Sequence, residues 1–285
     1  MGEQHKNIHW FPGHMAKTKR KITESLSLVD AAVEILDART PLSSRNPDLC
    51  EILKDKPRLI ILNKSDLADP NITKEWINYF QSLNIPAIAL DCKNGNGVKS
   101  FNSAIKKLLQ NKLESNEKKG INKALRLMVV GIPNVGKSSF INRLAQKRAK
   151  VEDRPGVTRG NQWFSTNENF LLLDTPGVLW PKFEDTAVAE RLAITGAIKD
   201  TVLDIEELAV KLLDFLIYSY QDNLINRYKI KSINEDSYEL LCDIAASRGM
   251  LARGGSADTE RAAIMLVDEF RGGKIGQISL EKPNF

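Results

Sequence analysis

Short apolar runs alternate with amphipathic stretches along the first 185 residues of the chain. Apolar runs bounded by turn residues are typical of buried strands, whereas apolar positions three and four apart indicate helices. The expected strands are Ala31–Leu36, Arg58–Leu62, Ala87–Leu90, Leu125–Val130 and Phe170–Leu173. The expected helices between them are Pro47–Lys54, Thr73–Leu83, Val98–Leu113 and Ser138–Leu144. This alternation predicts an α/β domain with a mainly parallel, doubly wound sheet.

Strand patterns fade after Pro181, and the remaining apolar spacing is typical of helices. The expected helices are Ala187–Ile198, Ile205–Tyr220, Ser237–Ala246 and Thr259–Phe270. The polar, Lys-rich stretch Glu114–Lys123 lacks periodicity and is interpreted as an exposed connection. We therefore predict two domains, an α/β domain at 1–185 with a basic N-terminal segment and a small all-α domain at 186–285.

The composition narrows the class of protein. Apolar residues make up 42% and charged residues 27% of the 285 positions, which is typical of a globular protein and excludes a disordered chain. No apolar run approaches the roughly 20 residues of a membrane helix, and the N-terminus lacks the apolar core of a signal peptide. Three widely spaced cysteines, Cys50, Cys92 and Cys242, indicate a reducing compartment and no metal site made of thiolates. We expect a cytoplasmic protein without a membrane partner.

The net charge of +5 is unevenly distributed. Residues 1–185 carry 29 Lys and Arg against 20 Asp and Glu, whereas residues 186–285 carry 12 against 16. A basic first part favours a polyanionic partner. A solvated charged surface explains the charge alone equally well.

Gly131–Ser138 matches the pattern G-x-x-x-x-G-K-[ST] between an expected strand and an expected helix. The glycines let backbone N–H groups surround phosphates, and Lys137 reaches the terminal phosphates. Ser138 offers its hydroxyl to Mg²⁺, and the positive end of the next helix faces the anion. The expected nucleotide contacts of this loop are Asn134, Val135, Gly136, Lys137, Ser138 and Ser139. An ordinary glycine-rich turn is the alternative.

Two further segments suit a triphosphate site. Asp174 follows an expected strand, where its carboxylate is suited to Mg²⁺, usually through water. The Gly177 backbone N–H can approach a γ-phosphate, and Thr158 in a preceding polar loop can close on the same Mg²⁺. Lys137, Thr158 and Gly177 are therefore expected to act on the reacting phosphate.

Asn63-Lys64-Ser65-Asp66 follows the expected strand Arg58–Leu62 and indicates guanine as the base. Guanine presents two adjacent N–H donors, which the Asp66 carboxylate can accept together, whereas adenine would leave the carboxylate unpaired. Asn63 is expected to brace neighbouring loops, and the Lys64 stem to cover the base. A polar turn is the alternative. Asp91, Cys92 and Lys93 form the second expected base-contacting loop, with the Cys92 N–H offered to the guanine oxygen.

The base-reading segment precedes the phosphate loop in this chain, which reverses the order of a common GTPase. Ligands bind at the carboxyl ends of parallel strands, so loops from any chain order can assemble one site. The sequence therefore predicts a circularly permuted P-loop GTPase domain. GTP loading is expected to reposition the helical domain, because the segment after Gly177 leads towards it.

The order of these motifs resembles that of the ribosome biogenesis GTPase A (YlqF-type) family of circularly permuted bacterial GTPases. The resemblance covers nearly the whole chain and rests also on further segments: Trp10–Met15, Asp37-Ala38-Arg39, Trp180–Asp185, Thr195–Ile198, Arg248-Gly249 and Gly254-Gly255. It implies a GTPase acting late in assembly of the large (50S) ribosomal subunit. The implied partners are the subunit precursor and ribosomal RNA, which the C-terminal domain contacts. No DNA partner is expected, and a monomer is the default.

Val178 occupies the position where many Ras-like GTPases place a glutamine that orients water. Pro12-Gly13 is expected to form a tight turn that aims the His14 ring, and the resemblance implicates His14 in hydrolysis. The alternative is a surface or RNA-contacting histidine. The resemblance also implies that Asn134 helps to hold K⁺ near the phosphates, the alternative being an asparagine that only braces the loop.

Basic residues near the N-terminus, Lys17, Lys19, Arg20 and Lys21, suit phosphate contacts. Trp10 and Phe11 either stack on bases or pack against the sheet. A second basic stretch consists of Arg143, Lys147, Arg148, Lys150, Arg154 and Arg159, and the helical domain offers Lys199, Arg248 and Arg253.

A GTPase switch is the leading hypothesis for the function. A GTP-dependent RNA-binding module with negligible turnover is the alternative, because Val178 cannot orient water. A P-loop ATPase with a fortuitous N-K-x-D and a small-molecule kinase are weaker candidates.

Overall fold

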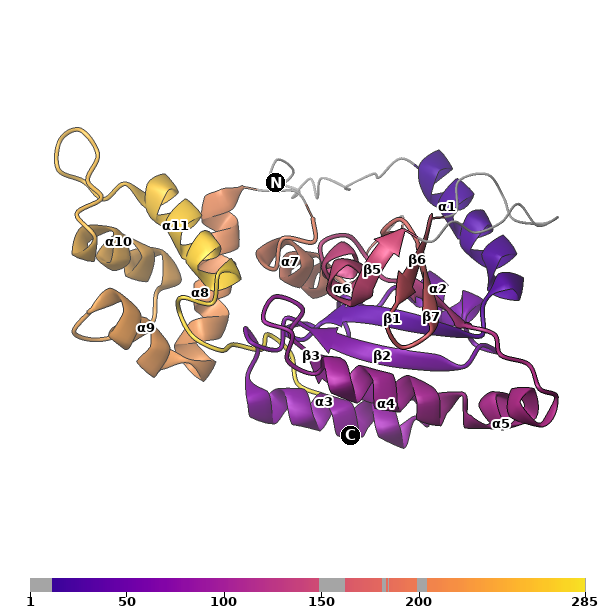
Figure 1. Cartoon of the computed structure of the whole chain (residues 1–285). Coiled ribbons are helices and arrows are strands. Elements are labelled where there is room, and N and C mark those ends of the chain that lie inside the picture. Colours follow the sequence, from indigo (N-terminus) through magenta and orange to yellow (C-terminus); the bar gives the residue numbers. More distant parts are fainter. Residues whose placement is uncertain (1–11, 149–161, 181–182, 184, 199–203, 285) are drawn as a thin grey trace.

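The computed structural model describes residues 12–148, 162–180, 183, 185–198 and 204–284. Its centre is a seven-stranded sheet in the order β3-β2-β1-β4-β7-β6-β5 (Figure 1). The strands are β1 (Ala31–Asp37), β2 (Arg58–Asn63), β3 (Ala87–Leu90), β4 (Leu125–Val130), β5 (Ala145–Arg148), β6 (Gln162–Thr166) and β7 (Phe170–Asp174). The five strands from β3 to β7 in this order pair in parallel. The predicted parallel sheet is therefore confirmed.

The two remaining strands, β6 and β5, extend the sheet as an antiparallel edge. Neither strand carries a continuous apolar run, so the local pattern does not predict them. A short strand rich in polar residues is typical of a sheet edge, where it discourages pairing with other chains.

Helices cover both faces of the sheet, as a doubly wound fold requires. Those of the sheet region are α1 (Pro12–Ser25), η1 (Leu26–Leu28), α2 (Pro47–Ile52), α3 (Pro70–Ser82), α4 (Val98–Leu108), α5 (Gln110–Lys118) and α6 (Lys137–Leu144). Neighbouring positions of β2 show the two faces: Leu59 belongs to the core of Phe101 from α4, and Ile60 to the core of Trp76 from α3. Because side chains alternate along a strand, a continuous apolar run buries both faces.

The second region is helical and lies beside the sheet (Figure 1). It contains α7 (Thr186–Ile194), α8 (Ile205–Ser219), α9 (Gln221–Tyr228), α10 (Ser237–Ser247) and α11 (Thr259–Arg271). Aspartates at 185, 204, 236 and 258 accept hydrogen bonds from the first turns of four of these helices. The end of α7 is shared between cores, because Leu192 packs with the sheet and Ile194 with the helices. Within the described residues, no helix is long and apolar enough to cross a membrane.

Residues 275–284 run back from the helical region to the sheet region (Figure 1). Ile278 and Leu280 donate their backbone N–H groups to the carbonyl oxygens of Leu67 and Arg39, at 2.9 and 2.8 Å. The Glu281 carbonyl accepts a 3.1 Å hydrogen bond from the buried Trp76 indole. The C-terminal segment that follows the helical region therefore packs against the sheet region.

Three local predictions are wrong. The connection expected from Glu114 onwards is helical as far as Lys118, because α5 continues through it. Pro12 and Gly13 lie in the first turn of α1 rather than in a tight turn. The helices α1 and α9 are both absent from the predicted helices. The helices α5 and α9 carry many polar residues, which weakens the apolar periodicity that identifies a helix.

Candidate functional site

The parallel register places five loops at one edge of the sheet. The strands β1, β2, β3, β4 and β7 run in the same direction, so the segments after Asp37, Asn63, Leu90, Val130 and Asp174 emerge together. Ligands of open α/β sheets bind at this carboxyl edge. The phosphate and base segments, which lie far apart in the sequence, are therefore neighbours in space.

Glycine is required at two positions of the phosphate loop. Gly131 has φ 149°, and a Cβ atom there would lie 2.5 Å from the Ile35 carbonyl oxygen. Gly136 has φ 98°, and its Cβ would meet the Asn63 amide nitrogen at 2.2 Å. The loop thus lies directly against β1 and against the base-reading segment. Its close packing against these two neighbours explains the glycine spacing of the motif.

Gly131→Ala should lower the free energy of unfolding by about 2–5 kcal/mol and weaken GTP binding. The substitution adds backbone strain of about 1–2 kcal/mol and an overpacking cost of about 1–3 kcal/mol against a backbone atom that cannot move aside. Gly120→Ala is the matched control: Gly120 also has positive φ (64°), but nothing lies within 4 Å of its Cβ position. Urea denaturation and GTP titration compare the two variants. Equal losses in both would show that the contact with Ile35 contributes nothing.

Lys137 begins α6 and is buried, with its Nζ donating a 2.7 Å hydrogen bond to the Ile132 carbonyl oxygen. Burial lowers the pKa of Lys137 to about 8, and the negative charge of Asp174 opposes this shift. A polyphosphate beside Nζ would favour the charged form. A Cβ atom on Gly177 would lie 2.8 Å from this Nζ, so the two expected γ-phosphate contacts lie together.

Two of the three expected Mg²⁺ ligands, Ser138 and Asp174, belong to neighbouring elements, and the third, Thr158, lies outside the described residues. Ser138 is exposed in the first turn of α6, and Asp174 ends β7, which pairs with the strand before the phosphate loop. Burial raises the pKa of Asp174, against the effect of the Lys137 charge. Among the described residues, no three His, Cys, Asp or Glu side chains are arranged to hold a metal. The donors fit an ion held by one hydroxyl, one carboxylate through water, and phosphate oxygens.

Asn63 joins the two nucleotide-binding segments. Its Nδ2 donates to the Val135 carbonyl oxygen at 2.7 Å, and its Oδ1 accepts from the Cys92 N–H at 3.3 Å. These two contacts connect the loop after β3 to the loop after β4, which is the geometry that the expected bracing role requires. The Lys64 ammonium lies 3.0 Å from the Asp37 carboxylate, which fixes the end of the stem expected to cover the base. Asp66 follows and is half-buried.

The second base loop is held by its own polar groups. The Asp91 carboxylate accepts from the backbone N–H groups of Lys93 and Asn94, at 2.9 and 3.0 Å. Burial raises the pKa of Asp91, but hydrogen bonds, chiefly from Asn94, outweigh it and lower the pKa below its ordinary value. The Cys92 N–H, which we expect to meet the guanine oxygen, donates to Asn63 in this structure. Because its carboxylate accepts hydrogen bonds from two backbone N–H groups of the loop, Asp91 holds the loop in this shape.

Arg143 is a supporting residue that the sequence pattern assigns differently. We expect it in a basic stretch for RNA, but its Nε donates to the Cys92 carbonyl oxygen at 2.9 Å, and its Nη2 donates to that of Lys93. Arg143 lies on α6, so it ties the helix after the phosphate loop to the second base loop. Neither the spacing nor the charge of the sequence reveals this contact.

Asp37 and Arg39 form a buried connection behind the base segment. The Arg39 Nε and Nη2 donate to the two Asp37 oxygens at 2.9 and 2.7 Å. The guanidinium also lies 5.3 Å from the centre of the Phe270 ring, on α11 of the helical region. The resemblance includes these residues, but only the structure shows that they link β1 to both Lys64 and the helical region.

Asn134 connects the phosphate loop to the helical region. Its Nδ2 donates a 2.7 Å hydrogen bond to the Gly196 carbonyl oxygen, just after α7. Its backbone has φ 61°, a conformation that asparagine adopts more readily than most residues.

Several expected residues lie outside the described part of the structure. They are Trp10, Phe11, Lys150, Arg154, Thr158, Arg159 and Lys199. His14 lies in the first turn of α1, but its side chain also lies outside the described part. Of the basic residues on α1, Lys19 pairs with Asp48 and Arg20 with Glu24.

The fold and the site define a circularly permuted P-loop GTPase. The family model described as "50S ribosome-binding GTPase" matches residues 126–244, which include the phosphate loop but not Asn63–Asp66, because the latter precede it in this chain. A ribosome biogenesis GTPase A from Priestia megaterium is 49% identical over 280 residues, 97% of each chain. The chain belongs to the ribosome biogenesis GTPase A family.

Two solved structures agree with this assignment. GDP-bound YlqF has a TM-score of 0.66 at 28% identity, over 93% of this chain and 99% of that chain. GNP-bound YlqF from T. maritima has a TM-score of 0.64 at 29% identity, over 94% and 99%. As a member of this family, the protein is a GTPase of ribosome biogenesis that binds GTP and GDP.

Proposed function

We propose that the protein hydrolyses GTP as a switch in late assembly of the large (50S) ribosomal subunit, and that the subunit precursor stimulates turnover. The observation that carries the proposal is the Asn63 bridge, which joins the base segment to the phosphate loop despite their reversed order. The matching family, described as a 50S ribosome-binding GTPase, supports the choice of particle. Ribosomal RNA is the polyanion that the basic sheet region contacts, and the protein acts as a monomer in the cytoplasm.

Hydrolysis begins when water attacks the γ-phosphorus and the bond to the bridging oxygen breaks, giving GDP and phosphate. The proton of the water ends on the phosphate. Lys137 and the N–H groups of the phosphate loop and Gly177 stabilise the charge that shifts onto the phosphate oxygens. Ser138, Thr158 and, through water, Asp174 would hold Mg²⁺, which would supply further positive charge.

Guanine is recognised at the edge formed by β2 and β3. Asp66 accepts the two guanine N–H groups, while Lys64 covers one face of the base. Asp91, Cys92 and Lys93 shape the second side of the base pocket, with Asn63 holding their loop against the phosphate loop. These residue assignments are part of the proposal.

The two candidate functions differ in whether a residue of the protein positions the attacking water. Val178 is buried at 2% exposure and packs in the core, so it cannot hold the nucleophile. We assign this role to His14, which orients the attacking water once the particle is bound. The burial of Val178 is also the observation that favours the second candidate function. This is a GTP-dependent RNA-binding module with negligible turnover, which is released by nucleotide exchange.

GTP hydrolysis with and without purified large ribosomal subunits tests the proposal. We expect strong stimulation, and we expect His14→Ala to lower the stimulated rate by about 10²-fold or more while nucleotide affinity stays unchanged. His9→Ala is the matched control, because it removes a histidine five positions away on the same segment. Tight GTP binding without stimulation would favour the binding module, and an unchanged His14→Ala rate would refute the role of His14.

The K⁺ proposal rests on the Asn134 side chain. Its Oδ1 would hold K⁺, and because its Nδ2 donates to Gly196, the cation would be coupled to the helical region. Wild-type turnover should therefore be faster in KCl than in NaCl, and Asn134→Ala should abolish the difference. Asn134→Asp keeps an oxygen but loses the donor to Gly196, and should retain the K⁺ preference. Equal wild-type rates in the two salts would contradict the role.

A further inference from the structure

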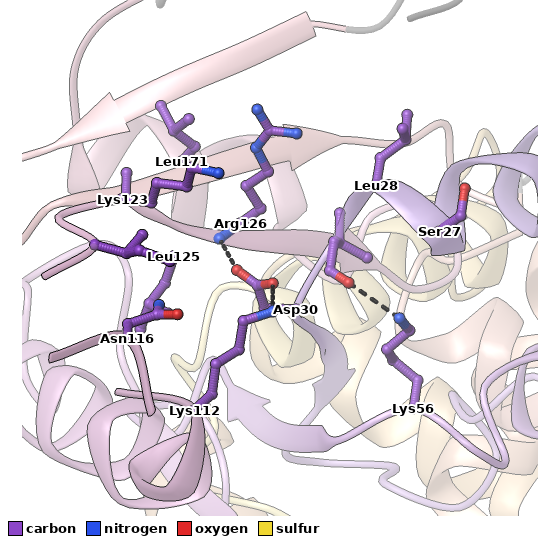
Figure 2. Close-up of a pocket in the computed structure, with 13 residues that line it drawn as sticks. Ser27, Leu28, Asp30, Lys56, Lys112, Asn116, Lys123, Leu125, Arg126 and Leu171 are labelled. Carbon is purple, nitrogen blue, oxygen red and sulfur yellow. Dashed lines mark hydrogen bonds and ion pairs between the residues drawn. The ribbon is translucent and has the colours of Figure 1, made fainter. Parts of the chain in front are cut away.

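A cleft of about 600 Å³ lies at the edge of the sheet where β1, β2 and β4 begin, opposite to the edge from which the nucleotide loops emerge. Figure 2 shows residues that line it. Its walls come from η1, from the residues before β1, β2 and β4, from the first residues of β4, from Leu171 of β7 and from α5. In a parallel sheet the amino ends of the strands lie a full strand length from the carboxyl ends. The cleft is therefore separate from the GTP site, and nothing in the hydrolysis mechanism uses it.

Positive charge dominates the polar lining of the cleft. Four basic side chains line it, Lys56, Lys112, Lys123 and Arg126, against a single carboxylate, Asp30. The surrounding sequence is also basic, since residues 106–126 contain seven Lys and Arg and two Glu. This edge is thus a concave, positively charged surface.

Both oxygens of the one carboxylate, Asp30, interact with other residues that line the cleft. Asp30 accepts a 2.8 Å hydrogen bond from the Arg126 backbone N–H, and its other oxygen pairs with the Lys112 ammonium. Its own N–H donates to the Arg126 carbonyl oxygen at 2.7 Å. Asp30 therefore holds the start of β1 against β4 and neutralises only Lys112 (Figure 2).

The other three cations have no carboxylate partner among the described residues. Lys56 donates to the Val29 carbonyl oxygen at 3.0 Å, a neutral acceptor that leaves its charge uncompensated. Arg126 lies 5.7 Å from the centre of the Trp163 ring, and Lys123 is exposed on the connection before β4. Three uncompensated charges around one hollow suit a ligand with repeated negative charges.

The wall formed by α5 supports a binding role. No residue of α5 is buried, and Leu113 is the one side chain of this helix that packs, half-buried, against the core of the sheet region. It nevertheless supplies Lys112 and Asn116 to the cleft. A helix that packs so little is explained better by what it presents to a ligand than by its contribution to stability.

We propose that this cleft binds the phosphate–sugar backbone of double-stranded RNA. Phosphates suit Lys56, Lys123 and Arg126, whose charges no described carboxylate compensates. The Asn116 amide can bond a ribose hydroxyl, which distinguishes RNA from DNA. Among the described residues, no aromatic side chain lines the cleft, whereas single-stranded sites stack bases on aromatic rings. The identity of the RNA as ribosomal rests on the proposed function, but duplex binding does not.

The test uses the triple variant Lys56→Gln/Lys123→Gln/Arg126→Gln, which removes the three charges that have no carboxylate partner. Binding to a mixed-sequence RNA duplex is measured over a range of salt concentrations. Each lost phosphate contact lowers the slope of log affinity against log salt by about 0.9, so we expect a slope lower by about 2–3. Affinity should fall by about tenfold or more, while GTP affinity and basal hydrolysis stay unchanged.

Lys74→Gln/Lys99→Gln/Arg261→Gln is the matched control, because it removes the same charges from exposed positions outside the cleft. If both triple variants lose duplex affinity equally, or if neither does, the proposal fails. An equal loss on single-stranded RNA would overturn the duplex assignment. Lys123→Glu, on an exposed connection, keeps the test decisive if the triple variant does not fold. Subunit stimulation of the wild type is measured separately, so failure of the switch function leaves the duplex result intact.

Discussion

Asp37→Asn is expected to lower the free energy of unfolding by about 3–5 kcal/mol, because it breaks a buried ion pair from one side. The Asp37 side chain is 3% exposed and accepts from Arg39 at 2.9 and 2.7 Å and from Lys64 at 3.0 Å. An asparagine would place an NH₂ group against the guanidinium. The buried charge of Arg39 would then have no carboxylate to compensate it.

The effect should also reach the base segment and the helical region. Lys64 would lose its anchor beside Asp66, and Arg39 would be less firmly held under Phe270. We therefore expect weaker GTP binding together with the lower stability. Urea denaturation and GTP titration measure the two effects. Glu168→Gln, which breaks the exposed pair with Lys106, is the control and should produce no measurable change.

The same ion pair predicts a pH dependence. Burial alone raises the pKa of Asp37, but the charges and hydrogen bonds of Arg39 and Lys64 outweigh burial and hold the pKa well below its ordinary value. The stabilisation is therefore complete above the unfolded pKa of about 3.9 and is lost as the pH falls below it. Asp37→Asn should show a smaller loss of stability between pH 5 and pH 3. A loss as steep as that of the wild type would contradict the assignment.

Asp66→Asn should weaken GTP binding by about 10³-fold and improve binding of xanthosine triphosphate. In the proposed site the carboxylate accepts both guanine N–H groups, and two hydrogen bonds to a charged group contribute about 3–6 kcal/mol. Xanthine carries an oxygen in place of the exocyclic amine, which an asparagine NH₂ can bond. Competition titration with both nucleotides measures the change.

The environment of Asp66 adds a pH test. Burial and the nearby charge of Asp91 raise the pKa of Asp66 above its ordinary value. GDP affinity of the wild type should therefore fall, as the pH is lowered, at a higher pH than an ordinary carboxyl would give. Asp66→Asn should lack this component. Ser65→Ala is the control, since it leaves the carboxylate intact, and identical pH profiles for wild type and Asp66→Asn would exclude the guanine contact.

Much of the sheet is predictable because its signals are local. The five parallel strands appear as apolar runs, and their structural bounds differ from the predicted ones by no more than the residue that follows each run, such as Asp37, Asn63 or Asp174. The polar strand β6 is formed by pairing with β7, and β5 by pairing with β6, rather than by burial of both faces. Their formation depends on a neighbour that the local pattern does not contain.

The candidate site also has one part that the sequence predicts and one part that it does not. Motifs with fixed spacing identify the phosphate loop, Asp174 and Asn63, because nucleotide chemistry constrains residues within a few positions of each other. The supports are long-range: Arg143 reaches Cys92 from 51 positions away, and Asn134 reaches Gly196 from 62. Such contacts depend on the packing of whole elements, so a single sequence does not reveal them.

The return of the C-terminal segment has a consequence for how the chain is made. Glu281 accepts hydrogen bonds from the backbone N–H groups of Leu42 and Ser43, at 3.1 and 3.0 Å, across 239 residues in the case of Leu42. At about 5–20 residues per second, translation needs roughly 12–50 s to add that stretch. The loop after β1 therefore emerges long before its partner. The nascent sheet region completes these contacts only after the helical region has been synthesised.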